Sequence, residues 1–271
     1  MEPLVTPEWL SAQDDIRILD ASWFLPEHGR DARAEFESAH IPGAIFVDLP
    51  SLNGADGNLA DGPAFAARMG ALGVSDRDRI VVYDNSPLHS AARAWWALKT
   101  MGARDVAILD GGLAAWQAAG LPVEAGVVEP APARFSVLGD ATRALDMAAM
   151  KAAVAHRDQI VDARSPARFA GEEPEPREGI EPGHIPGAIN LHYARLFEPD
   201  GRWKPRAALA AEFDAADIEL DQPIVTTCGS GVTAAALAFA ATLLGARNVA
   251  LYDGSWAEWG ADPEAPKETG R

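Results

Sequence analysis

The sequence is poor in cysteine and in basic residues, and it has no long apolar run. One cysteine, Cys228, among 271 residues excludes an internal disulfide and a zinc site built from several cysteines. With 40 acidic residues against 23 basic ones, the formal net charge of -17 opposes binding to nucleic acid or to an anionic membrane. No stretch of about 18 apolar residues occurs, and the first residues show no basic and apolar leader pattern. We therefore expect a cytoplasmic protein that acts without nucleic acid or membrane.

An internal repeat is the most informative pattern in the sequence. The hexapeptide His-Ile-Pro-Gly-Ala-Ile begins at His40 and again at His184. Three further matches recur at nearly the same spacing, namely Asp20 with Asp162, Gly102 with Gly245, and Trp116 with Trp259. A repeat of this length indicates a duplicated structural unit. A chain of 271 residues, 48% of them hydrophobic, is long enough for two ordinary domains.

Each half alternates short apolar runs with helical patterns. Runs such as 80–83 and 224–227 are apolar on both parities, as expected for strands buried on both faces of a sheet. Residues 91–101 and 234–244 read as helices. This alternation predicts an α/β fold of parallel strands with helices on both faces.

A proline-rich stretch separates the two halves. Residues 121–133 contain three prolines and a glycine, which rule out a continuous helix there. We predict an N-terminal domain, a linker and a cysteine-bearing C-terminal domain at residues 1–125, 126–142 and 143–271.

Cys228 lies between the predicted strand 224–227 and an alanine-rich helix. In open α/β sheets, loops at the carboxyl ends of parallel strands form the ligand-binding crevice. Gly229 and Gly231 let the backbone turn its N–H groups inward, and the next helix adds the positive end of its dipole. Such surroundings lower the pKa of a thiol from about 8.5 and so create the nucleophilic thiolate. We predict that Cys228 is a nucleophile in an anion-binding loop, with Ser230 and Thr233 as further donors.

Two other interpretations of the lone cysteine are weaker. A small buried core residue is the common fate of such a cysteine, but a core strand gains nothing from a following Gly-x-Gly. A cysteine phosphatase needs an arginine six residues after its cysteine, and that position holds Ala234. Without the guanidinium, a phosphate dianion loses its main ligand.

The repeated histidines and the late tryptophans are interpreted as structural. His40 and His184 both precede Ile-Pro-Gly, whereas only one half has a nucleophile. Their duplication therefore favours turn residues that hydrogen-bond the backbone. Trp256 and Trp259 are expected in the core.

Over nearly its whole length the chain resembles the tandem rhodanese-family sulfurtransferases. The resemblance is carried by the paired His-Ile-Pro-Gly segments, Leu19-Asp-Ala-Ser-Trp, Tyr252-Asp-Gly-Ser-Trp and the Cys-Gly-Ser-Gly-Val-Thr loop. It implies two tandem rhodanese-like domains, each a mainly parallel β-sheet with helices on both faces. It also implies a covalent persulfide on Cys228 without metal or organic cofactor, and a first domain that has lost its cysteine, where Asp84 now stands. The implied substrate-binding residues of the loop are Gly229, Gly231, Val232 and Thr233, with Ser230 as a second catalytic residue.

The resemblance is strongest to the branch that uses 3-mercaptopyruvate as sulfur donor. The thiosulfate branch carries basic residues where this loop has neutral Gly229 and Ser230. Fifteen positions separate Phe169 from His184, against four between Phe36 and His40, so an insertion exists only in the active half. Two arginines in and beside this insertion match the substrate-binding arginines of the mercaptopyruvate branch, namely Arg168 and Arg177.

Three alternatives stay open. The arginines could be ordinary solvated charges, because the insertion also holds several glutamates that offer surface partners. The enzyme could be a thiosulfate:cyanide sulfurtransferase, or the chain could be a non-catalytic rhodanese-fold binding module.

The first half departs from the family in one respect. The mercaptopyruvate branch often places an Asp and a His there, which complete a relay with the loop serine, whereas here Pro50 and Asn58 occupy those positions. Ser230 therefore has no histidine base from this segment. Since no second cysteine can resolve a persulfide, we expect an outside acceptor, either cyanide or a thiol such as that of a thioredoxin-like protein.

Overall fold

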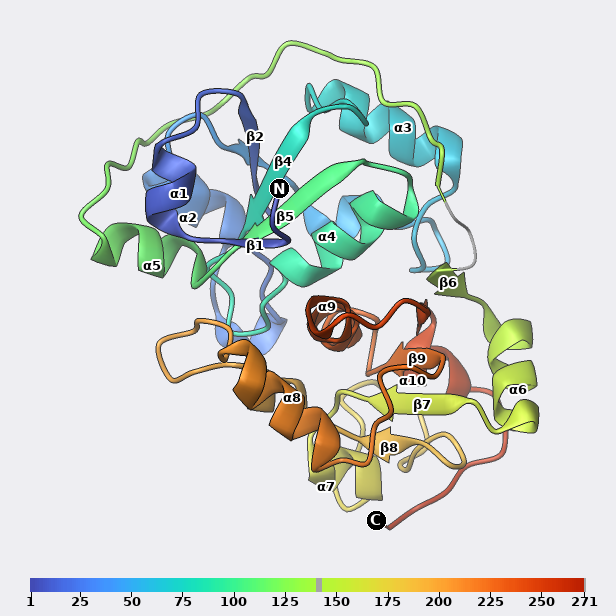
Figure 1. Cartoon of the computed structure of the whole chain (residues 1–271). Helices are drawn as coiled ribbons and strands as arrows, with labels where there is room; N and C mark the ends of the chain where they lie inside the picture. Colours follow the sequence, from blue (N-terminus) through green and yellow to red (C-terminus); the bar gives the residue numbers. More distant parts are fainter. Residues whose placement is uncertain (140–142, 271) are drawn as a thin grey trace. The chain divides into compact units, whose positions relative to one another are not determined.

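The computed structural model describes residues 1–139 and 143–270, and its chain divides into two compact units (Figure 1). The first unit comprises Met1–Ala141 with Pro199–Trp203, and the second comprises Thr142–Glu198 with Lys204–Arg271. The sequence pattern did not predict that 199–203 belongs with the first unit. Of the predicted linker 126–142, the last three residues lie outside the described residues.

The described part of that linker, residues 126–139, forms no helix or strand and is hydrogen-bonded to the first unit. The Ala133 N–H donates to the Gly70 carbonyl (2.8 Å), and the Ser136 N–H donates to the Asp76 carboxylate (2.8 Å). These bonds satisfy backbone groups that a segment rich in proline cannot pair within itself.

The first unit is built on a parallel five-stranded sheet. Its strand order is β1 (Leu4–Val5), β5 (Asp105–Leu109), β4 (Arg79–Tyr83), β2 (Ile16–Asp20), β3 (Ile45–Phe46). Figure 1 shows helices on both faces, with α1 (Pro7–Ser11), α2 (Ala32–Ser38) and α5 (Gly112–Ala118) on one side, and α3 (Gly62–Ala71) and α4 (Ala91–Thr100) on the other. The central strand β4 is buried on both faces of the sheet, since the consecutive residues Val81 and Val82 are both fully buried.

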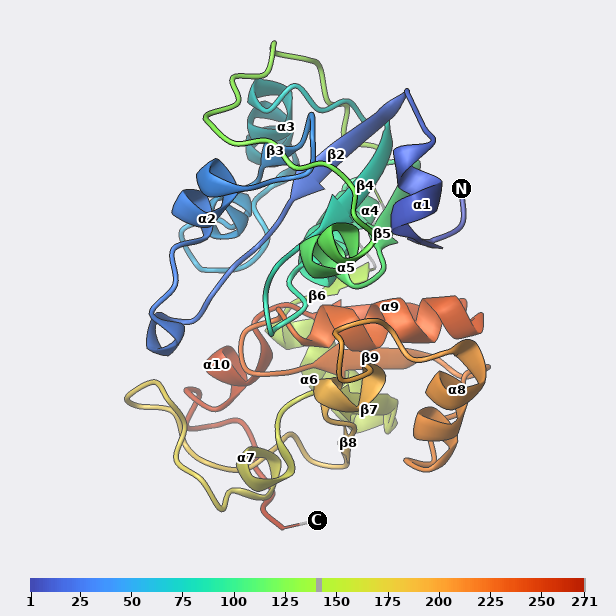
Figure 2. The ribbon, with the colours of Figure 1, turned by 90° about the vertical axis from the view of Figure 1, so that its left-hand side faces the viewer.

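The second unit repeats this architecture. Its parallel sheet has the order β6 (Ala144–Leu145), β10 (Val249–Tyr252), β9 (Ile224–Thr227), β7 (Gln159–Asp162), β8 (Ile189–Asn190). The helices are α6 (Met147–His156), α7 (Pro166–Ala170), α8 (Arg206–Asp214), α9 (Ala234–Leu244) and α10 (Ser255–Trp259) (Figure 2). Short 3-10 helices occur in both units, at η1 (Pro26–His28) and η2 (Leu49–Leu52) in the first and at η4 (Tyr193–Leu196) in the second. The predicted α/β fold of two similar units is confirmed.

Both repeated histidines are structural, as predicted. The Nδ1 atom of His40 lies 2.7 Å from the Phe36 carbonyl, and that of His184 lies 2.8 Å from the Phe169 carbonyl. Each imidazole also stacks on the phenylalanine whose carbonyl it meets. Trp256 and Trp259 are almost completely buried, which confirms that they belong to the core.

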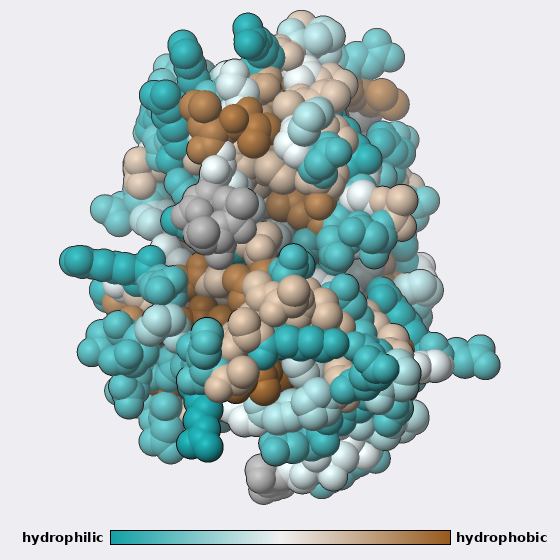
Figure 3. Space-filling view, turned by 90° about the vertical axis from the view of Figure 1, so that its right-hand side faces the viewer, coloured by the Kyte–Doolittle hydropathy of each residue, from teal (hydrophilic) through white to brown (hydrophobic). Residues whose placement is uncertain are grey.

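Hydrophilic side chains predominate on the face of the molecule drawn in Figure 3. The exposed large hydrophobic residues of the described chain fall between residues 123 and 138, namely Val123, Val127, Val137 and Leu138. None of the described helices has the length and apolar character needed to cross a membrane.

Candidate active site

Cys228 is the first residue after β9, in the loop that leads into α9, and its side chain is buried. The start of α10 holds its backbone in place. The Cys228 N–H donates to the Ser255 hydroxyl (3.3 Å), and the Cys228 carbonyl accepts from the Trp256 N–H (2.9 Å). Ser255 is itself buried in a left-handed conformation (φ +52°) and donates to the Tyr252 carbonyl (2.9 Å). Ser255 was not predicted as a site residue; the repeat matches it with Gly112, so the serine occurs only in the cysteine-bearing half.

The loop after Cys228 offers backbone donors that are not used within the described part of the chain. Within the described residues, no protein acceptor receives the N–H groups of 229–234. Gly231 adopts φ +77°, a left-handed conformation that favours glycine and turns the chain toward α9. Successive unpaired N–H groups ahead of a helix N-terminus form a site suited to an anion.

The sister loop in the first unit shows this kind of site occupied. Asp84 stands in place of the cysteine, and its carboxylate accepts the N–H groups of Ser86 (3.0 Å) and Ala91 (2.7 Å). Ala91 begins α4, as Ala234 begins α9. The first unit thus supplies an anion of its own to its loop, whereas the second unit does not.

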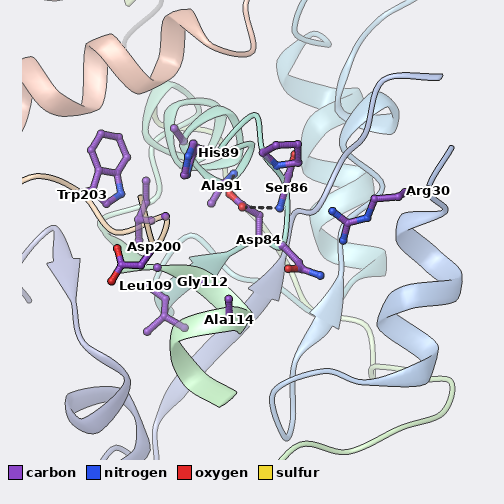
Figure 4. Close-up of a pocket in the computed structure, with 16 residues that line it drawn as sticks. Arg30, Asp84, Ser86, His89, Ala91, Leu109, Gly112, Ala114, Asp200 and Trp203 are labelled. Atoms are coloured by element: carbon purple, nitrogen blue, oxygen red, sulfur yellow. Dashed lines mark hydrogen bonds between the residues drawn. The ribbon is translucent and has the colours of Figure 1, made fainter. Parts of the chain in front are cut away.

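A cavity of about 270 Å³ within the first unit opens onto Asp84 (Figure 4). His89 and Trp203 are among the residues that line it. Burial raises the pKa of Asp84 to about 6 and lowers the pKa of His89 to about 4. With a carboxyl group in place of a thiol, this pocket has no sulfur nucleophile.

Arg168 lies directly against the Cys228 loop. It is on α7, and its guanidinium is so close to Gly229 that a Cβ there would come within 3.1 Å of Nη2. Nη2 donates to the Glu175 carboxylate at 2.5 Å. The Nε atom is buried and has no acceptor among the described residues. The structure therefore brings one of the two predicted arginines to the residue that follows the cysteine.

The side chain of Glu175 is buried, whereas the other glutamates of the insertion are exposed. Its side chain is 3% exposed, and its second carboxylate oxygen accepts from Arg164 Nη1 (2.8 Å). Arg164 also bonds the Asp162 carboxylate (2.7 Å) and the Gly183 carbonyl (2.8 Å). Glu175 is therefore a buried partner of the two arginines and not one of the surface partners that the insertion offers. Arg164 was not predicted either. Its signal in the sequence is a charge directly after a buried strand, at a position where the first half has a serine.

The other predicted site residues are Arg177 in the insertion and three residues of the Cys228 loop. Arg177 is exposed in a bend two residues after Glu175, and its side chain makes no hydrogen bond or ion pair with the described residues. Ser230, Val232 and Thr233 are half-buried in the loop. The structure brings these three beside the cysteine by chain continuity, and Arg177 makes no hydrogen bond or ion pair with them in the described part of the chain.

Tyr193, at the start of η4, is a site residue that the sequence analysis missed. Its N–H donates to the carbonyl of Ala163, which directly follows β7 at the same end of the sheet as Cys228 (3.1 Å). Burial and the negative charge of ionised Cys228 raise the pKa of Tyr193. The ring of His192 meets the Tyr193 ring edge-on at 5.0 Å, and burial lowers the pKa of His192. The first half has aspartate and leucine at the matching positions, so this aromatic pair is specific to the cysteine-bearing unit.

Comparison with known proteins agrees with this geometry. The model of the rhodanese-like domain matches residues 6–119 and 144–262. A 3-mercaptopyruvate sulfurtransferase of Homo sapiens is 41% identical over 94% of this chain and 91% of its own. A thiosulfate sulfurtransferase of Gallus gallus is 39% identical over 94% and 92%. The crystal structure of SseA from Escherichia coli, a 3-mercaptopyruvate sulfotransferase, aligns with a TM-score of 0.85 and 37% identity over 94% of this chain and 99% of its own. The chain therefore belongs to the rhodanese-like domain family, with two such domains in tandem.

Proposed function

We propose that this protein is a sulfurtransferase that takes sulfur from 3-mercaptopyruvate and carries it as a persulfide on Cys228. The observation that carries the proposal is the contrast between the two sister loops. In the first unit, N–H groups of this loop hold a carboxylate, whereas the matching N–H groups around Cys228 have no acceptor among the residues that the structure describes. An anionic sulfur on Cys228 supplies the missing acceptor.

The reaction proceeds in two displacements at sulfur. The Cys228 thiolate attacks the sulfur of mercaptopyruvate, so that an S–S bond forms and the C–S bond breaks. The electron pair leaves as the enolate of pyruvate, which takes up a proton. An acceptor thiolate, or cyanide, then attacks the outer sulfur and regenerates the Cys228 thiolate. Neither step needs a metal or an organic cofactor.

Donor binding is assigned to the arginines and the loop. Arg168, held against Gly229, takes the donor carboxylate, and Arg177 approaches it from the exposed part of the insertion. Ser230 hydrogen-bonds the ketone side of the donor, and the N–H groups of the loop stabilise the charge on sulfur. Because Cys228 is the only cysteine, the acceptor is an outside thiol, and a thioredoxin-like dithiol has suitable chemistry. A cytoplasmic location stays a prediction.

Thiosulfate is the second candidate donor. The similarity to a thiosulfate sulfurtransferase of Gallus gallus favours it. The neutral loop Gly229-Ser230 disfavours it, because a small dianion bound at the sulfur needs cations in the loop itself. A higher kcat/KM for thiosulfate than for mercaptopyruvate would reverse the assignment.

A mass spectrum of the intact protein tests nucleophile and donor together. The wild type is incubated with mercaptopyruvate or with thiosulfate, and Cys228→Ser serves as the control. We expect the mass of one sulfur atom to be added to the wild type by mercaptopyruvate and nothing to be added to the folded variant. A sulfur-free wild type would support the non-catalytic binding module instead.

A further inference from the structure

We propose that Glu175 is a positioning residue for donor binding, which holds Arg168 against the Cys228 loop so that its guanidinium meets the donor carboxylate. The proposal rests on the function proposed above. It concerns a residue that does not contact the donor itself, and it assigns a purpose to the buried carboxylate of the insertion.

A chain of ion pairs leads from the core to the loop. Asp162 at the end of β7 is fully buried and binds Arg164, which is 1% exposed. Arg164 binds Glu175, which is 3% exposed, and Glu175 binds Arg168, which is 26% exposed. Only the last member of the chain reaches solvent. These ion pairs therefore fix the position of the Arg168 side chain, beside the reactive cysteine, relative to the sheet.

Glu175 leaves part of Arg168 free for a ligand. One carboxylate oxygen of Glu175 binds each arginine, so Arg168 gives it only the Nη2 donor. The Nε donor of Arg168 has no acceptor among the described residues. Buried donors without acceptors are rare, and one beside a reactive cysteine marks a place for a ligand oxygen. A planar guanidinium can bind Glu175 and a donor carboxylate with different N–H groups.

Arg164 does not need Glu175 to stay in place. It is already bonded to Asp162 and to the Gly183 carbonyl, and its guanidinium lies over the Trp256 ring at 4.5 Å. Arg168, in contrast, has no other carboxylate partner among the described residues. An arginine side chain released from such a contact regains rotamer freedom, which it must lose again when the donor binds.

The test is a double-mutant cycle on steady-state kinetics. Glu175→Gln keeps the size of the side chain but presents an amide N–H₂ to one of the two arginines. We expect it to raise KM for mercaptopyruvate about 10-fold, the effect of losing one well-formed bond to a charged group, with little change in kcat. In the Arg168→Ala background, the same substitution should leave KM unchanged. Glu173→Gln, an exposed glutamate of the same insertion, is the matched control.

A second donor separates positioning from general damage. Mercaptoacetone has the thiol and ketone of mercaptopyruvate but a methyl group in place of the carboxylate. Glu175→Gln should leave its KM unchanged. A similar rise in KM for both donors, or a rise that persists without Arg168, would overturn the proposal.

Two further outcomes are distinct. A wild type that forms no persulfide from mercaptopyruvate defeats the proposed function rather than the role of Glu175. If Glu175→Gln does not fold, Glu175→Asp replaces it, because it keeps the charge on a shorter arm and should raise KM less than 10-fold. Failure of both variants to fold would show that Glu175 is structural and would overturn the proposal.

Discussion

Asp84 makes the stability of the first unit depend on pH in a defined direction. Burial raises its pKa to about 6, whereas an aspartate in an unfolded chain has a pKa of about 3.9. Between these values the folded protein keeps a proton that the unfolded chain has released. The free energy of unfolding therefore falls as the pH rises from about 4 to about 6.

The size of this effect follows from the same two pKa values. A difference of about 2 corresponds to about 3 kcal/mol of stability lost by pH 7, which is a large part of the stability of an ordinary domain. Asp84→Asn removes the ionisation and keeps the shape of the side chain. Its free energy of unfolding, relative to that of the wild type, should rise by up to about 3 kcal/mol between pH 4 and pH 7.

Urea unfolding followed by circular dichroism at a series of pH values measures this difference. Carboxylates elsewhere in the chain contribute equally to both proteins, so they cancel in the comparison. Asp14→Asn, at an exposed position of the first unit, is the control and should leave the curve unchanged. Equal pH dependence of wild type and Asp84→Asn would refute the reasoning that burial disfavours the charged carboxylate.

Two further predictions concern the cysteine-bearing unit. Gly229→Ala would bring a Cβ within 3.1 Å of Arg168 Nη2. We therefore expect KM for mercaptopyruvate to rise severalfold, while the thermal midpoint stays near that of the wild type. An unchanged KM would contradict the contact between Gly229 and Arg168. The chain has three tyrosines, and burial raises the pKa of each. The pKa values of Tyr83 and Tyr252 are raised furthest, because the nearby carboxylates of Asp20 and Glu258 add to the effect of burial. The first tyrosinate absorbance in an alkaline titration therefore reports Tyr193. Cys228→Ser should lower its pKa by removing the thiolate charge, and an unmoved titration would place Tyr193 away from the sulfur.

The fold and the nucleophilic loop could be predicted from the sequence because their signals are local. The helix predicted at 234–244 is α9 (Ala234–Leu244), which ends where Gly245 takes a left-handed conformation. The strand predicted at 224–227 is β9 (Ile224–Thr227), because apolar residues on both parities demand burial on both faces. The repeat then supplied the comparison between Asp84 and Cys228.

The rest of the site depends on contacts between residues that no local pattern joins. Glu175 lies in a strongly acidic insertion and reads as a solvated charge. It is buried because Arg164, from the end of β7, and Arg168, from α7, converge on its two oxygens. Tyr193 likewise reads as an ordinary core aromatic until the sheet places the start of η4 beside the end of β7.

The two sister loops also predict how the persulfide form should behave. The carboxylate oxygens of Asp84 lie two bonds from Cβ, and so does the outer sulfur of a persulfide on Cys228. The repeat matches the N–H groups that bind Asp84, from Ser86 and Ala91, with those of Ser230 and Ala234. An anionic outer sulfur would therefore gain hydrogen bonds that the free thiol lacks.

Persulfidation should consequently stabilise the fold. The carboxylate of Asp84 costs more to bury than its two N–H bonds return, whereas the larger and more weakly hydrated sulfur anion costs less to desolvate. Hydrogen bonds to a charged group contribute about 1.5–3 kcal/mol each, so we expect a net gain of about 2 kcal/mol. For a domain of this size that raises the thermal midpoint by about 5 °C. Calorimetry before and after loading with mercaptopyruvate measures the shift, and cyanide, which removes the outer sulfur, should reverse it. Cys228→Ser should show no shift with either reagent. A loaded form that unfolds at the same temperature as the free thiol, or below it, would mean that the empty N–H groups of the second loop do not bind the sulfur.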